Sequence, residues 1–192
     1  LYCPFPYSRH AHILETIISN TRRYEIVVPD DFQATWPGTV GFKPSPIRDV
    51  TTERFYSELY SGMVDGLATH GVSFDEQTLL LLREELDLFA NTIDAARRDL
   101  ERLKPDAVLV PSDNTPPFSA VTHVARAMNI PVILLQHGMD CERYYLDDAY
   151  ASHIATWGPY RRERYAHDSE WEPEQVRDVG NVHYDHVDAS LL

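Results

Sequence analysis

The stretch from Lys104 to Asp140 reads KPDAVLVPSDNTPPFSAVTHVARAMNIPVILLQHGMD and decides the fold of this chain. It contains two short apolar runs, Ala107 to Val110 and Val132 to Leu135, which are typical of strands buried on both faces. Between them, Pro116-Pro117 precedes apolar residues at helical spacing. A helix can begin at this pair, because proline is tolerated in the first turn of a helix. The pattern predicts a strand, a helix and a second strand.

A strand, a crossover helix and a strand of this length favour parallel pairing with a right-handed crossover. Both strands then end at the same edge of the sheet. The turns Ser112-Asp113-Asn114 and Gln136-His137-Gly138 follow these strands directly. We therefore expect both turns to face one crevice, where open parallel sheets bind their ligands.

The same reading extends along the rest of the chain. A helix from about 74 to 103 begins with the Ser-x-x-Glu spacing of a capping box at Ser73 and Glu76, and it ends before Pro105. Further strands are expected at 1–6, 24–28, 153–156 and 176–179, and further helices at 52–67 and 159–166. This alternation predicts an α/β fold with a doubly wound, mainly parallel, Rossmann-like sheet, and one domain over residues 1–192 with an irregular loop at 30–50.

Composition excludes several classes of function. The net charge of −13 argues against nucleic acid or an anionic membrane as a partner, because both require clustered Lys and Arg. No apolar run is long enough to span a bilayer, and no signal peptide is evident, so we expect no transmembrane segment. Two cysteines rule out a disulfide framework and favour a cytoplasmic location, although one disulfide between them stays open.

The carboxyl edge of the predicted sheet gathers residues suited to acid-base chemistry. His10, in the turn after the first strand, and His137 are candidate general bases, because an imidazole titrates near neutral pH. Asp113 is the candidate carboxylate that would orient the base. Nine histidines occur in the chain, and a histidine chosen at random is an ordinary surface or hydrogen-bonded side chain. The candidate substrate contacts are Asn114, Gln136, Gly138, Asp140, Trp157 and Asn181.

Signatures of other ligands are weak or missing. His10-Ala11-His12 and His183-Tyr184-Asp185-His186 contain metal-ligand types without the spacing of a zinc site, so we expect no metal. The chain has neither a Gly-x-Gly-x-x-Gly turn nor a P-loop, which removes the main support for a dinucleotide or P-loop reading.

Several of these motifs together resemble a known family. They are Pro105-Asp106, Ser112-Asp113-Asn114-Thr115, Asn129-Ile130-Pro131-Val132, Gln136-His137-Gly138, Ala151-Ser152-His153, Trp157-Gly158 and Val179-Gly180-Asn181. The set resembles the N-terminal half of GT-B glycosyltransferases, and it is similar to the UDP-N-acetylglucosamine 2-epimerase branch and to transferases that build capsule and teichoic acid polymers. The opening Pro4 to His10 looks like the first turn of nucleotide-sugar transferases, in which a histidine is the base for the acceptor hydroxyl.

This resemblance implies a function and two alternatives. The chain would be the acceptor-side domain of a glycosyltransferase that uses a nucleotide sugar as donor substrate, a glycan as acceptor and no other cofactor. A second Rossmann-like domain after Leu192 would supply most of the donor pocket, so the isolated chain is expected to be inactive. The alternatives are a non-hydrolysing 2-epimerase and a non-catalytic binding domain. The epimerases carry a glutamate where this chain has Gln136, and an amide cannot abstract a proton, which weakens the first alternative.

Overall fold

The computed structural model describes the residues numbered 1–4, 16–17, 19, 23–33, 38–136, 150–168 and 171–180. These residues form an α/β structure in which all strand pairs are parallel, as the sequence predicts. One group pairs two strands, β1 (Val27–Pro29) and β2 (Val40–Phe42). The other group places four strands side by side, in the order β3 (Val108–Val110), β4 (Val132–Leu135), β5 (His153–Thr156) and β6 (Val176–Asp178).

The N-terminal residues join the two groups into one sheet. Tyr2 forms parallel bridges to Val27 on one side and to Val108 on the other. The N–H of Cys3 donates a hydrogen bond of 2.9 Å to the carbonyl of Val27. Residues 1–3 therefore lie in the centre of the sheet, between β1 and β3.

The resulting strand order places the topological switch point of the sheet. Across the sheet the order is β2, β1, residues 1–3, β3, β4, β5 and β6. The chain starts in the centre, builds outward to one edge, and then returns to build the other edge. In doubly wound sheets this reversal is the topological switch point, and ligands bind beside it at the carboxyl ends of the strands. Here it falls between residues 1–3 and β3.

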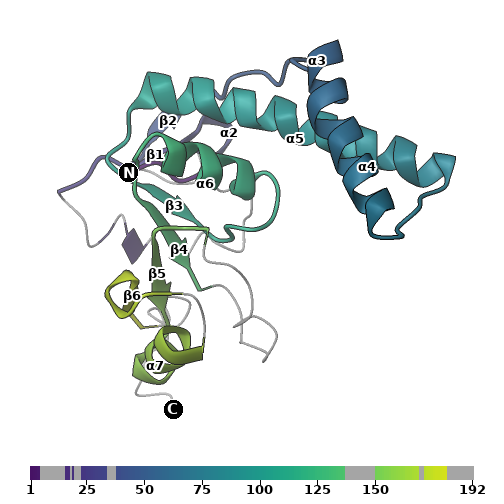
Figure 1. Cartoon of the computed structure of the whole chain (residues 1–192). Coiled ribbons are helices and arrows are strands. Elements are labelled where there is room, and N and C mark those ends of the chain that lie inside the picture. The colour runs from purple at the N-terminus through teal and green to yellow at the C-terminus, as the bar shows by residue number, and fades with distance from the viewer. Residues whose placement is uncertain are drawn as a thin grey trace.

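Both faces of the sheet are buried at β3, which explains why this strand is apolar at every position. Val108 and Val110 lie in a core cluster with residues of two helices, α5 (Glu76–Leu103) and α6 (Phe118–Ala127). Leu109, which points the other way, belongs to a second cluster with Val28. In Figure 1, α5 and α6 cover the first face, and α7 (Pro159–Asp168) lies beside β5 and β6.

The ends of α5 show how the sequence fixes a long helix. The Oδ1 atom of Asp75 accepts a hydrogen bond of 2.7 Å from the N–H of Thr78, so Asp75 is the N-cap. The expected capping box at Ser73 is therefore wrong by two residues, because a carboxylate immediately before the first turn is the stronger acceptor. At the other end Lys104 adopts a left-handed conformation, with φ of 46°, and α5 ends before Pro105 as predicted.

A continuous helical run precedes α5 and agrees with the helix expected at 52–67. It consists of α3 (Glu53–Phe55), a π-helical turn, η2 (Tyr56–Tyr60), and α4 (Ser61–Thr69), and Thr52 caps its start. In Figure 1 this run and the first half of α5 extend away from the sheet. Among the described residues, no helix is both long and apolar enough to cross a membrane.

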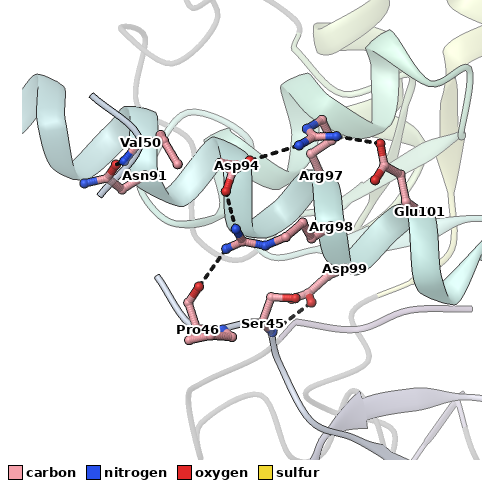
Figure 2. A network of polar contacts seen from close by, with 9 residues as sticks. All are labelled: Ser45, Pro46, Val50, Asn91, Asp94, Arg97, Arg98, Asp99 and Glu101. Carbon is pink, nitrogen blue, oxygen red and sulfur yellow. Dashed lines mark hydrogen bonds and ion pairs between the residues drawn. The ribbon is translucent and has the colours of Figure 1, made fainter. Parts of the chain in front are cut away.

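The stretch 30–50 is only partly the irregular loop that its prolines and glycines predict. It contains α2 (Asp30–Gln33) and β2, which are too short to produce a readable periodicity. Residues 43–51, here called the strap, then run along α5. Asp99 Oδ1 accepts from the N–H of Ser45 (2.8 Å), and Asn91 Oδ1 accepts from the N–H of Val50 (2.9 Å), as Figure 2 shows.

Candidate functional site

Parallel pairing brings the carboxyl ends of β3, β4 and β5 to one edge of the sheet. Ser112 follows β3 by two residues, and Gln136 and Trp157 directly follow β4 and β5. Because β3 pairs with β4 and β4 with β5 in parallel, all three residues lie along the carboxyl edge. The carboxyl ends of β3, β4 and β5 therefore share one edge, whereas the grouping of the predicted site side chains at this edge stays a prediction.

Asp113 holds the main chain in front of β5. Its side chain is buried, with the residue 6% exposed, and Oδ2 accepts the N–H groups of Ala151 (2.9 Å) and Tyr150 (3.2 Å). The guanidinium of Arg126 donates to the carbonyls of the same two residues, at 2.6 Å from Tyr150 and 3.1 Å from Ala151. These contacts give Asp113 a positioning role that the sequence reading did not assign, because a carboxylate that accepts two main-chain donors fixes a turn.

Gln136 and Trp157 are brought together at neighbouring strand ends. The Oε1 atom of Gln136 accepts the N–H of Trp157 (2.9 Å), and its carbonyl oxygen accepts the indole Nε1–H (2.7 Å). Gln136 is buried at 6% exposure. A neutral amide suits this position, because a glutamate here would bring a charge out of water. Gln136 therefore holds Trp157 at two points: its side-chain oxygen binds the main-chain N–H, and its main-chain carbonyl binds the indole N–H.

Asn114 lies in a cluster of hydroxyl and amide groups in front of α6. Ser112 Oγ donates to Asn114 Oδ1 at 3.1 Å and is also hydrogen-bonded to the hydroxyl of Thr115. The carbonyl of Thr115 accepts the N–H of Ser119 (2.9 Å), in the first turn of α6. Asn114 is exposed, as a substrate contact must be. Ser112 and Thr115 belong to this cluster, although neither is among the predicted contacts. The sequence feature that could have identified them is the spacing of two hydroxyl residues three positions apart, directly before the proline pair.

The remaining predicted site residues lie outside the described residues. They are the two candidate bases and three of the substrate contacts: His10, His137, Gly138, Asp140 and Asn181. Their grouping with Asp113 stays a prediction. Among the predicted residues that the structure describes, Gln136 contacts Trp157, while Asp113 and Asn114 make separate contacts.

The thiol of Cys3, next to the switch point, is unsuited to act as a nucleophile. Cys3 is fully buried, and burial raises the pKa of its thiol to about 12. A thiol with such a pKa is protonated at neutral pH and behaves as a small apolar side chain. Within the part of the chain that is described, no three His, Cys, Asp or Glu side chains are grouped closely enough to hold a metal ion.

A scan against protein-family models and a search of curated proteins found no match to this chain. Arguments about function therefore depend on the residues and on the fold. The structure contributes three facts to them: a parallel sheet with a defined switch point, an exposed polar cluster after β3, and a Gln136–Trp157 pair at the ends of β4 and β5.

Proposed function

We propose that this chain is the acceptor-side domain of a metal-independent glycosyltransferase of GT-B architecture, which transfers sugar from a nucleotide sugar to a glycan in polysaccharide synthesis. In this proposal His10 or His137 removes the proton from the acceptor hydroxyl. Asn114, Gln136, Gly138, Asp140, Trp157 and Asn181 line the substrate side of the cleft, and a second Rossmann-like domain completes the donor pocket.

The strand order is the observation that carries this proposal. Residues 1–3 and β3 are parallel neighbours, so the segments that leave them start side by side at the switch point. One of these segments leads to His10 in the sequence, and the other carries the Ser112–Thr115 cluster. A base and a set of hydroxyl-binding groups from two adjacent strand ends suit an acceptor sugar, which presents several hydroxyls.

The test is sugar transfer by the full-length protein. We expect His10→Ala or His137→Ala to lower the rate of transfer about 100-fold or more, as the loss of a general base does. His70→Ala is the matched control, because His70 is an exposed histidine at the end of α4. Transfer and donor hydrolysis are measured by release of the nucleotide, and normal rates in both site variants would refute the assignment of the base.

A second candidate is a non-catalytic sugar-nucleotide-binding domain. The observation that favours it is the structural use of Asp113 and Gln136, whose side chains hold main-chain groups of neighbouring strands. Calorimetry separates the two candidates. Saturable binding of a nucleotide sugar by a full-length protein that transfers no sugar to any glycan tested would favour the binding domain.

A further inference from the structure

The helical projection next to the sheet has an unusual property. It consists of residues 53–90, here called the arm: α3, η2, α4 and the first half of α5, which extend away from the sheet in Figure 1. No residue from 53 to 94 is fully buried. Helices of this length depend on tertiary packing of an apolar face for most of their stability. The arm therefore lacks the dry core that such an element needs.

One side of α5 in the arm is occupied by the preceding helical run. The hydroxyl of Tyr56 donates to Asp87, with 2.5 Å to Oδ1 and 2.6 Å to Oδ2, and the hydroxyl of Tyr60 donates to the carbonyl of Leu79 at 3.1 Å. The guanidinium of Arg83 lies 3.9 Å from the centre of the Tyr56 ring. These contacts fix how the two helices of the arm pack.

Three leucines of α5 in the arm are nevertheless exposed to solvent. Leu80, Leu81 and Leu88 are 56%, 55% and 51% exposed. Leu80 and Leu88 lie eight residues apart, so both fall on one side of the helix within about two turns. We call these three leucines the outer face of the arm. Three exposed leucines on one helix differ from the single exposed apolar residues that every surface contains.

The outer face continues into a surface that already binds a polypeptide segment. Residues three or four positions apart lie on the same side of a helix. Along α5 from Leu88, this spacing leads to Asn91, Arg98 and Arg102. These side chains hold the strap: Arg98 donates to the carbonyl of Pro46 (2.7 Å), and Arg102 donates to the carbonyl of Lys43. The same side of α5 is thus covered by the strap in its second half and exposed as leucines in its first half.

Charge identifies the kind of partner that fits. The arm carries eight Asp and Glu residues and only two Arg. Both arginines are engaged, since Arg54 pairs with Glu58 at 2.8 Å and Arg83 lies over Tyr56. A second copy would bring two acidic arms together, and like charges in close contact are unfavourable. The chain's own residues 181–192 contain two Asp and no Lys or Arg, so they are not complementary either.

We propose that the outer face docks an amphipathic helix of another protein, one that presents apolar side chains at helical spacing with Lys and Arg on its flanks. The apolar side chains cover Leu80, Leu81 and Leu88. The cationic flanks lie against acidic neighbours such as Glu84 and Glu85. Binding of an amphipathic helix along an apolar surface is a common mode of peptide recognition.

The test uses a synthetic helical peptide of about 14 residues composed of leucine at helical spacing and lysine elsewhere. Fluorescence anisotropy with the full chain in about 0.15 M salt should show saturable binding at a 1:1 ratio. The double substitution Leu80→Gln and Leu88→Gln should weaken binding about tenfold or more, because it removes the apolar contacts and leaves the charge unchanged.

Two controls make the experiment decisive. Tyr160→Gln changes an apolar residue that is 62% exposed on α7, outside the arm, and should leave affinity within about twofold of the parent. A peptide with glutamate in place of every lysine should bind about tenfold more weakly or worse. Circular dichroism of each variant checks that the helices are retained.

Three results would each overturn the proposal. The first is an absence of binding by the leucine-lysine peptide. The second is equal affinity of the double variant and the parent chain, which would mean that the peptide responds only to the overall negative charge. The third is self-association of the chain, seen by sedimentation and abolished by the double substitution. That result would assign the outer face to a second copy.

Discussion

At the scale of single residues, Gln136 is the side chain whose role the structure defines best. Its amide oxygen is the acceptor for the Trp157 N–H, and it is buried between β4 and β5. We expect Gln136→Leu to lower the free energy of unfolding by about 1–3 kcal/mol, because it leaves the Trp157 N–H without this acceptor. Urea unfolding monitored by tryptophan fluorescence measures this change.

A control variant separates this effect from a general response to glutamine loss. Gln77→Leu alters an exposed glutamine on α5 and should change stability by less than about 0.5 kcal/mol. Equal stability of the two variants would contradict a stabilising role for the hydrogen bond between Gln136 and Trp157.

The sequence predicts that Gln136 lies at a strand end. It does not predict Trp157 as its partner, because a hydrogen bond between residues 21 positions apart depends on the order of the strands. For the same reason, the sequence predicts Asp113 as the carboxylate that orients the base and does not predict its contact with the main chain before β5.

At the scale of elements, the strap shows how charged side chains order a segment that has no periodicity. Asp99 holds the N–H of Ser45, and Asn91 holds the N–H of Val50. We expect Asp99→Ala to speed amide exchange at Ser45 about tenfold or more, since a hydrogen bond to a charged group contributes roughly 1.5–3 kcal/mol. Exchange at Val50 should change much less. Hydrogen exchange followed by NMR resolves the two amides.

The reciprocal variant completes this experiment. Asn91→Ala should speed exchange at Val50 and spare Ser45. Equal acceleration of both amides in both variants would show that the strap opens as one unit, contrary to the separate contacts.

The helix α5 is predictable because its apolar period repeats many times. The strands β4 and β5 are predictable because polar turns bound their apolar runs. The elements α2 and β2 are not predictable, because three or four residues are too few to show a period. The strap is not predictable, because side chains of α5, distant in the sequence, hold it in place.

At the scale of the whole molecule, the parallel sheet is predictable and its order is not. The β3–α6–β4 unit follows from local sequence, since a crossover of this length leaves few alternatives. The position of residues 1–3 between β1 and β3 depends on pairing with strands that are more than twenty and more than one hundred residues away. No local pattern encodes these pairings. The shared carboxyl edge of β3 and β4 could therefore be predicted from the sequence. The position of the switch point along this edge could not.

The central position of residues 1–3 leads to a prediction for Cys3. In the folded chain its pKa is about 12, against about 8.5 for an exposed thiol, so the folded state favours the protonated form. Stability from this difference is fully present below about pH 8.5 and is lost as the pH rises toward 12. A Cys141→Ser variant should therefore be less stable at about pH 9 than at about pH 8, measured by urea unfolding at pH values where most tyrosine side chains are still protonated. A variant with Cys3→Ala added should lose this part of the pH dependence. An identical slope in the two variants would mean that Cys3 is not buried where the two halves of the sheet meet.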